Sequence, residues 1–232
     1  MTFMAPNARS RITIASTSSR DRLGIAAIGT GQAYLEEGLS LASPDDSIRK
    51  RALARMKDQL ELGRALSAQV IVGLIRGTVK SKEEIPAALS RLEEALRELG
   101  EHAQKIVAPG LLLEPINRYE TRLINSVEQG IELLEGLSGL PVKLLADTFH
   151  MNIEDRDLAG SIRVAGSRLG HVHFADSNRR APGQGHLDFE PVLQALGEIA
   201  YSGFLSAEIL PEPSAEEAVK LTAQFFRSAA GR

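Results

Sequence analysis

The sequence predicts an α/β fold of the (β/α)8 barrel (TIM-barrel) type, incomplete at its N-terminus. Short apolar runs alternate with amphipathic segments along most of the chain, and four successive runs end at or just before a carboxylate or an imidazole. Continuous apolar runs of this length are typical of buried parallel strands, and their alternation with helices indicates a parallel sheet covered by helices. In such barrels the reactive side chains lie at the C-terminal ends of the strands. The four polar run ends therefore predict a functional site at that edge.

Length and composition limit the function classes. The 232 residues are 43% hydrophobic and 25% charged, which is ordinary for one soluble globular domain. The absence of Cys excludes disulfides and thiolate ligands, so a metal would be held by His, Asp and Glu. A net charge of -3 with no Trp leaves little material for a nucleic-acid surface, and no apolar run reaches the ~18 residues of a membrane span. We therefore expect a cytoplasmic protein without nucleic-acid or membrane partners.

The first 22 residues are expected to be a poorly ordered lead-in to one barrel-type catalytic domain, residues 23–232. The lead-in is rich in Arg, Ser and Thr, has almost no acid, and lacks the ~7–15-residue apolar core of a secretory signal. A transit peptide has a similar composition, and that alternative is left open.

Six apolar runs predict strands, and a seventh is doubtful. The six are 23–30, 68–75, 110–116, 142–148, 169–176 and 203–209, and the doubtful one is 11–15. A complete barrel of this type has eight strands in typically about 250 residues, so fewer strands than a closed barrel needs are recognisable.

The segments between these runs carry helix signals. Ser43 before Pro44 predicts a cap followed by a first-turn proline, 81–84 (SKEE) predicts a capping box, and Ser214 predicts the cap of the last helix. The stretch 29–38 (GTGQAYLEEG) fits neither a dinucleotide-binding nor a P-loop spacing and is interpreted as a turn. Apolar positions at helical spacing are Ile48, Ala52, Met56 and Leu60; Leu89, Leu92, Leu96 and Leu99; Ile124, Val127, Ile131 and Leu134; Leu158, Ile162 and Ala165; Phe189, Val192, Leu196 and Ile199; and Val219, Thr222 and Phe226.

Four consecutive strands each supply one candidate metal ligand: Glu114, Asp147, His173 and Glu208. Their separations of 26 to 35 residues are close to the ~30 or more residues of one βα unit, so each unit brings one ligand to the same rim. His171 points the same way as His173 and is interpreted as a polar core residue one layer below. A single carboxylate more often caps a helix or forms a salt bridge, but four candidates in register predict a shared site. Three carboxylates and one imidazole suit Mn²⁺, Co²⁺ or Mg²⁺ better than structural zinc.

Three blocks of sequence resemble the xylose isomerase-like sugar isomerase/epimerase family. They are 114–120 (EPINRYE), 147–154 (DTFHMNIE) and 170–173 (GHVH), the last followed by 177–183 (SNRRAPG). Within that family they are most similar to the ketose 3-epimerases that act on D-tagatose and D-psicose (D-allulose). The resemblance extends from about Leu23 to the C-terminus and is specific at these blocks.

The resemblance implies a role for each candidate residue. Glu114, Asp147, His173 and Glu208 would hold a divalent metal, commonly manganese, and the two glutamates would also transfer protons. Glu120, His150 and Arg179 would contact a small-molecule sugar; read without the resemblance, His150 and Arg179 are also compatible with a solvated loop histidine and a surface arginine.

The expected chemistry follows from these residue types. The metal would act as a Lewis acid on the ketose carbonyl and stabilise the enediolate formed when the neighbouring C–H loses its proton. Two carboxylates on opposite sides of the sugar would let one remove the proton and the other return one to the opposite face, which inverts the carbon.

Several alternatives remain open from the sequence. A sugar-phosphate isomerase would need an anion site, which Arg179, Arg180 and the 182–185 loop can supply. Aldose–ketose isomerisation and polyol dehydration use the same metal and carboxylates. An apurinic-site endonuclease shares the fold but would need further His ligands and a basic face, whereas this chain has five His and a net negative charge.

The strand count leads to a further expectation. Against the resembled family, the run 23–30 corresponds to the third strand, so the first βα unit and most of the second are expected to be absent. An open barrel would expose the edges of its outer strands and the apolar faces of helices that lack neighbours. We expect either a shortened, incomplete barrel covered by a partner chain or by residues 1–22, or a form of reduced activity. Whether the chain forms a homo-oligomer is left open.

Overall fold

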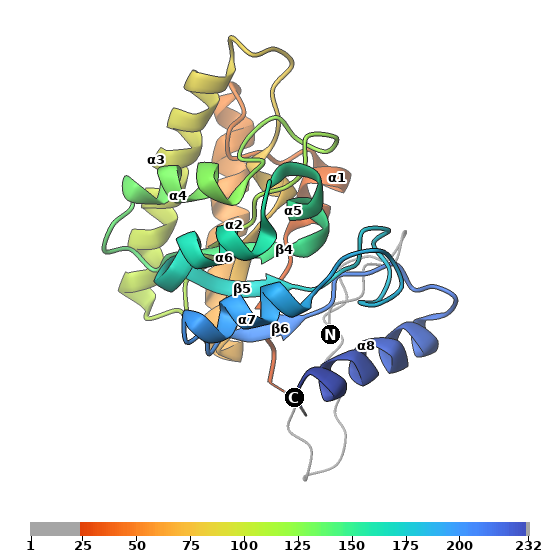
Figure 1. The fold of residues 1–232 in the computed structure, drawn as a ribbon. Helices are drawn as coiled ribbons and strands as arrows, with labels where there is room; N and C mark the ends of the chain where they lie inside the picture. The colour runs from red at the N-terminus through yellow and green to blue at the C-terminus, as the bar shows by residue number, and fades with distance from the viewer. Residues whose placement is uncertain (1–23, 231–232) are drawn as a thin grey trace.

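The computed structural model describes residues 24–230, in which six parallel strands form one sheet surrounded by eight α-helices (Figure 1). The strands are β1 (Ala27–Ile28), β2 (Gln69–Val72), β3 (Leu111–Leu113), β4 (Val142–Asp147), β5 (Leu169–His173) and β6 (Phe204–Ser206). The α-helices are α1 (Gly31–Glu37), α2 (Asp46–Leu66), α3 (Ile85–Ile106), α4 (Val127–Glu135), α5 (Thr148–Glu154), α6 (Leu158–Ala165), α7 (Glu190–Glu198) and α8 (Ala215–Ala230). Two 3-10 turns, η1 (Leu74–Arg76) and η2 (Gly166–Arg168), complete the elements. The expected lead-in 1–22 and the doubtful strand 11–15 lie outside the described residues.

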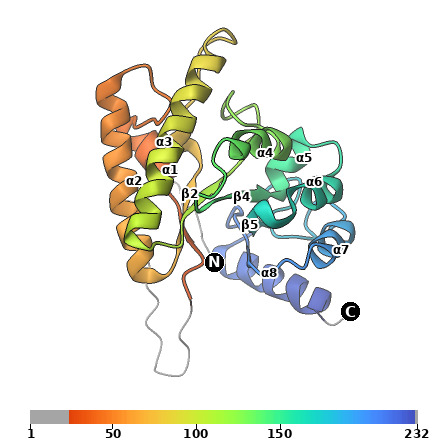
Figure 2. The same ribbon diagram turned by 90° about the vertical axis from the view of Figure 1, so that its left-hand side faces the viewer.

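The sheet has the topology of a partial barrel. Its strands are ordered β1-β2-β3-β4-β5-β6, every neighbouring pair is parallel, and each connection passes through a helix. The long helices α2 and α3 pack side by side, while α4, α6 and α7 continue the outer layer (Figure 2). This confirms the predicted α/β barrel type with six recognisable strands. No helix within residues 24–230 combines the length and the apolar character that a membrane span requires.

Alternate residues of the central strands serve two cores. Val70, Val72, Leu111 and Leu113 belong to the main core, in which the apolar faces of the outer helices are buried. The residues between them point to the opposite face, where Ile71, Leu112 and Leu145 form a small separate cluster with the partly buried Ala27. This inner apolar layer forms the floor beneath the strand ends.

Two helix starts differ from the sequence prediction. The helix expected after Ser43-Pro44 begins at Asp46, and Asp45 caps it by accepting hydrogen bonds from the amides of Ser47 and Ile48 at 2.8 and 3.4 Å. Ser43 instead accepts from the amide of Asp45, so it organises the turn before the cap. The capping box at 81–84 does not form, because the Glu84 carboxylate accepts from the amide of Lys80 and α3 begins at Ile85.

Two other segments were also predicted incorrectly. The stretch 29–38 contains the two-turn helix α1, which Gly38 ends with a left-handed φ of 66°. Ile124 is not helical: its φ is 55°, and α4 begins at Val127 under a Ser126 cap. The predicted Ser214 cap is confirmed, because its hydroxyl accepts from the amide of Glu217 at 3.2 Å.

Candidate active site

Five of the predicted residues meet at the C-terminal end of the sheet. Atoms of Glu114, Asp147, His150 and Glu208 that can bind a metal lie within 4.8 Å of one another. His173 Nδ1 lies 3.6 Å from Glu114 Oε1, 3.4 Å from Asp147 Oδ2 and 3.3 Å from Glu208 Oε2. The structure therefore brings together the four predicted ligands and adds His150 to them. We call these five residues the acidic cluster.

A β-bulge aligns two members of the acidic cluster. Leu144 pairs with Leu169, but the next residue, Leu145, pairs with His171, so Gly170 has no partner and Asp147 lies opposite His173. A Cβ on Gly170 would lie 2.7 Å from Leu112 Cδ2, and only glycine avoids this close approach.

Asp147 uses its two carboxylate oxygens differently. Oδ1 caps α5 by accepting from the amides of Phe149 and His150, at 2.8 and 3.3 Å. Oδ2 is buried and has no hydrogen-bond partner among the described residues. Asp147 can therefore cap α5 with one oxygen and bind a metal with the other. The same cap also brings His150, which lies on α5, to the cluster.

Glu114 reaches the cluster because the neighbouring strand ends in a glycine. It follows β3 directly and is 6% exposed. A Cβ on Gly73, the residue after β2, would lie only 2.9 Å from Glu114 Oε2. The space for this carboxylate therefore depends on the missing side chain of Gly73.

The charges of the acidic cluster stabilise one another. Burial disfavours a charged His173, but Asp147, Glu114 and Glu208 outweigh it and raise the His173 pKa well above its ordinary value. Burial also opposes ionisation of Asp147, yet His150, His173 and Arg179 lower its pKa to about 2. The pKa of Glu208 is likewise lowered, against burial, chiefly by His173. The aspartate and Glu208 are thus anionic at neutral pH.

The cluster fits a divalent cation. Within the part of the chain that the structure describes, Glu114 Oε1, Asp147 Oδ2 and His173 Nδ1 are buried without hydrogen-bond partners, although His173 Nδ1 lies within 3.6 Å of both oxygens. A buried polar atom without a partner is costly, and a shared cation would satisfy all three at once. Carboxylate oxygens with one imidazole are a donor set for divalent metals.

The two histidines differ in their surroundings. His150 Nδ1 is already engaged, 2.8 Å from Asn117 Nδ2, which leaves Nε2 as the nitrogen it can offer. His173 Nδ1 lies within 3.6 Å of all three carboxylates, whereas His150 is the histidine whose ligand atom groups with them within 4.8 Å.

The other predicted contact residues lie at the rim of the acidic cluster. Arg179 joins Glu120 and Glu208, with Nη1 3.2 Å from Glu120 Oε1 and Nη2 3.4 Å from Glu208 Oε2. Its guanidinium also lies 4.8 Å from the centre of the Phe149 ring. The structure therefore connects the predicted sugar contacts to the predicted metal ligands through one arginine.

Two rim residues were missed by the sequence analysis. Asn117 donates to Glu120 Oε1 at 3.1 Å and contacts His150, so it links two predicted sugar contacts. Asp176 is fully buried and accepts from the amides of Ser177, Gly183 and Leu187, which shapes the loop that carries Arg179. Asn117 contacts His150 across 33 residues, which no local sequence pattern indicates, whereas the partners of Asp176 lie within 11 residues of it.

His171 lies below the cluster, as expected for a polar core residue. It is 1% exposed, and its Nε2 lies 2.7 Å from Ser206 Oγ on β6. Burial lowers its pKa to about 3, so the ring is neutral.

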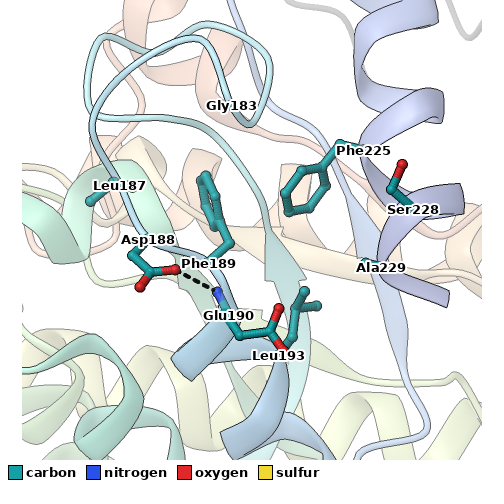
Figure 3. Close-up of a pocket in the computed structure, with 9 residues that line it drawn as sticks. All are labelled: Gly183, Leu187, Asp188, Phe189, Glu190, Leu193, Phe225, Ser228 and Ala229. Carbon is teal, nitrogen blue, oxygen red and sulfur yellow. Dashed lines mark hydrogen bonds between the residues drawn. The ribbon is translucent and has the colours of Figure 1, made fainter. Parts of the chain in front are cut away.

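A pocket of about 240 Å³ lies apart from this site, between the 183–190 loop, the start of α7 and α8 (Figure 3). Phe189 and Phe225 line it with their rings packed edge to face, 5.2 Å between centres, and Asp188 accepts from the amide of Glu190. None of the residues of the acidic cluster lines this pocket, so it is separate from the candidate active site.

Comparisons with known proteins agree with this arrangement. A family model described as xylose isomerase-like TIM barrel matches residues 10–229. The chain is 34% identical over 177 residues to a D-psicose 3-epimerase of Ruminiclostridium cellulolyticum, in a match that covers 73% of this chain and 59% of that relative. It is 30% identical over 210 residues to an L-ribulose 3-epimerase of Mesorhizobium japonicum, covering 88% and 70%.

The structure is also similar to solved epimerases. A D-psicose 3-epimerase crystallised with D-tagatose, from Clostridium cellulolyticum, superposes with a TM-score of 0.68 at 30% identity, covering 80% of this chain and 64% of that one. This chain thus spans less than two thirds of the first relative and of this solved structure.

Proposed function

This chain belongs to the xylose isomerase-like TIM barrel family, and on that premise we propose that it is a divalent-metal-dependent ketose 3-epimerase. The observation that supports the proposal is a set of three buried polar atoms at one end of the sheet, on predicted ligands, for which residues 24–230 supply no hydrogen-bond partner. The ketose 3-epimerase names of several relatives support the choice of reaction.

In this proposal Glu114, Asp147, His173 and Glu208 hold the metal, and manganese is the preferred ion, with cobalt or magnesium as alternatives. When bound, the cation would polarise the ketose carbonyl and offset the negative charge that develops on its oxygen. Neutral imidazole and ionised carboxylates are the forms that ligate.

The proton transfers belong to Glu114 and Glu208. Glu114 follows β3 and Glu208 follows β6, so β4 and β5 separate them and they approach the cluster from different directions. One carboxylate takes the proton from the carbon beside the carbonyl, and the electron pair of that C–H bond moves toward the carbonyl oxygen. The other carboxylic acid returns a proton to the opposite face. General acid–base assistance of this kind is typically worth about 10²–10⁴-fold in rate.

Glu120, His150 and Arg179 orient the sugar in this proposal. Arg179 has five donors and lies between two carboxylates, so its fork can bind sugar hydroxyls while it holds Glu208 in place. Asn117 fixes His150 and Glu120 relative to each other. Hydroxyl contacts of this kind determine which ketose is held in a reactive position.

The groups that would bind a phosphate are already engaged, which favours a free sugar. The amide of Gly183 donates to Asp176, Arg180 forms an ion pair with Glu212, and Arg179 pairs with Glu120 and Glu208. A phosphate at the 182–185 loop would have to displace these contacts.

Incubation with free and phosphorylated ketoses in D₂O, with Mn²⁺ or with a chelator, tests the proposal. We expect epimerised product with deuterium on the inverted carbon only when the metal is present and only from free ketoses. Metal-independent turnover, or a product without carbon-bound deuterium, would refute the proposed reaction.

A further inference from the structure

Arg76 is a fully buried arginine beside the acidic cluster. It ends η1, directly after β2, and its exposed fraction is 0%. Its Nε donates to the carbonyl of Gly73 at 3.0 Å, and its Nη1 donates to the carbonyls of Leu123 and Ile124 at 3.1 and 3.0 Å. Arginine is almost never fully buried unless it is paired, so these contacts need an explanation.

The two segments that Arg76 joins carry the functional residues. Gly73 lies against the Glu114 carboxylate, which fills the space that a side chain at Gly73 would take. Leu123 and Ile124 end the 117–124 loop, which carries Glu120 at the rim. Arg76 therefore connects the backbone beside one predicted ligand to the loop that holds a predicted sugar contact.

The end of that loop adopts an unfavourable backbone conformation. Ile124 is β-branched and has a φ of 55°, where residues other than glycine are uncommon. Its carbonyl accepts from Arg76 Nη1 and also from the amide of Ile116 at 3.1 Å. Such strain persists only where the surroundings hold it, and Arg76 supplies the only charged donor among the hydrogen bonds described for this carbonyl.

Other contacts join the same loop to the residues that follow Arg76. Thr121 Oγ1 donates to the carbonyl of Gly77 at 2.9 Å, and the amide of Arg122 donates to Thr78 Oγ1 at 3.2 Å. At the other end of the loop, Arg118 pairs with Glu154 at 2.7 Å. The loop is thus attached at both ends, with Arg76 as its buried charged attachment and Thr121 as a buried neutral one.

The charge of Arg76 also faces the site. Burial lowers its pKa to about 10, while Glu114 and Glu120 act in the opposite direction, so the group remains cationic at neutral pH. Its Nη2 has no hydrogen-bond partner among residues 24–230, so the hydrogen bonds described for the side chain all go to the three carbonyls.

We propose that Arg76 is a positioning residue that locks the 117–124 loop against the end of β2 and so places Glu120 for the sugar. This inference rests on the proposed function for the identity of the sugar, but the lock itself is a property of the fold. Arg76 does not touch the sugar; it acts through the backbone of Gly73, Leu123 and Ile124.

Three variants and one control test the lock. Arg76→Met removes the charge and all three hydrogen bonds, and Arg76→Lys keeps the charge but cannot span the three carbonyls. Thr121→Val keeps Arg76 and removes the two neighbouring hydrogen bonds of the Thr121 hydroxyl, which donates to the carbonyl of Gly77 and accepts from the amide of Leu123. The control is Arg97→Met, because Arg97 also donates to a backbone carbonyl, that of Gly136, which ends α4 on the outer layer of helices.

Two readouts do not depend on activity. Arg118 and Arg122 are exposed trypsin sites inside the loop, so their cleavage rates and the hydrogen exchange of the 117–124 amides report its order. We expect both rates to rise in Arg76→Met at least about tenfold over Arg97→Met, with a smaller rise in Arg76→Lys. The catalytic readout is kcat/KM for the ketose, which we expect to fall up to about 10²-fold in Arg76→Met, mainly through KM.

The outcomes separate this inference from the proposed function. If the wild type epimerises no ketose but the loop loosens in Arg76→Met, the lock stands and the proposed reaction fails. If the loop of folded Arg76→Met is as protected as that of Arg97→Met, the lock is wrong whatever the activity. Should Arg76→Met not fold, Arg76→Lys and Thr121→Val decide the question, and wild-type loop protection in both would overturn the proposal.

Discussion

Replacing Gly73 with alanine tests whether the exact placement of the Glu114 carboxylate controls metal binding. The added Cβ would lie 2.9 Å from Glu114 Oε2, whereas ordinary contact begins at 3.4 Å, so the carboxylate must move by about 0.5 Å (3.4 − 2.9). The carboxylate is the far end of a flexible side chain, and the next nearest atoms, in Ile116 and Ile71, lie 3.7 and 3.8 Å away. The shift therefore displaces a predicted ligand without disrupting the core.

The expected effect is a functional loss without a comparable loss of stability. Misplacement of a reacting group by about 1 Å can cost about 10²-fold, so a half-ångström shift is expected to lower kcat/KM by about tenfold. We expect the dissociation constant of Mn²⁺ to rise by about tenfold as well, which corresponds to about 1.4 kcal/mol. Isothermal titration of the chelator-treated protein with Mn²⁺ measures the affinity, and thermal melting measures the stability.

The matched control is Gly29→Ala. Gly29 lies one residue beyond β1, as Gly73 lies one residue beyond β2, and a Cβ there would meet nothing within 4 Å. We expect Gly29→Ala to bind Mn²⁺ like the wild type. Wild-type affinity and turnover in Gly73→Ala would show that the Glu114 position is not critical, and the ligand assignment would have to be revised.

Three further predictions address the ligands, the rim and a partly buried acid. Glu114→Gln and Asp147→Asn should each lose most bound metal and activity while the domain stays folded, which metal analysis and circular dichroism check; normal metal content in both would contradict the site. Arg179→Ala should lower kcat/KM but keep its metal, because it removes the contacts to Glu120 and Glu208 while every predicted ligand side chain stays present; unchanged kinetics on the true ketose would contradict its role. Burial raises the pKa of Asp155 to about 6, above the ordinary ~3.9, so its contribution to stability is present at low pH and is lost as pH rises through about 6. The melting temperature of Asp155→Asn relative to wild type should therefore increase between about pH 4 and pH 7, and a difference independent of pH would contradict this.

Residues on the strands were predictable from the sequence because their environment is periodic. Asp147 and His173 end buried strands, and the alternation of side chains across a strand places each on the inner face. Glu208 lies two residues beyond β6, yet the same alternation from Ser206 still applies to it. The alternation of side chains along each strand was sufficient to predict where these residues lie, because the geometry of a parallel sheet repeats with every βα unit.

The loop contacts were not predictable, because they join residues that are distant in sequence. Arg76 bonds carbonyls 47 and 48 residues away, and Asn117 contacts His150 across 33 residues. The periodic pattern of apolar residues within one helix or strand does not indicate partners so far apart. The missed capping box has a different, local cause: the Glu84 carboxylate accepts from the amide of Lys80, four residues earlier, instead of closing the box predicted with Ser81.

The two kinds of contact imply that metal affinity and sugar affinity can be changed separately. The predicted ligands stand on strand ends whose positions are set by the apolar cores on both faces of the sheet. The predicted sugar contacts Glu120 and Arg179 stand on loops that are held by two buried charges, Arg76 and Asp176. Changes at those two buried charges should therefore weaken sugar binding while the metal stays bound, whereas the Gly73 change should weaken both, because the displaced carboxylate is itself a ligand. Mn²⁺ affinity and KM should therefore be measured for each of these variants. If KM changes while Mn²⁺ affinity does not, the metal site and the sugar site are independent. If both always change together, the two sites depend on each other.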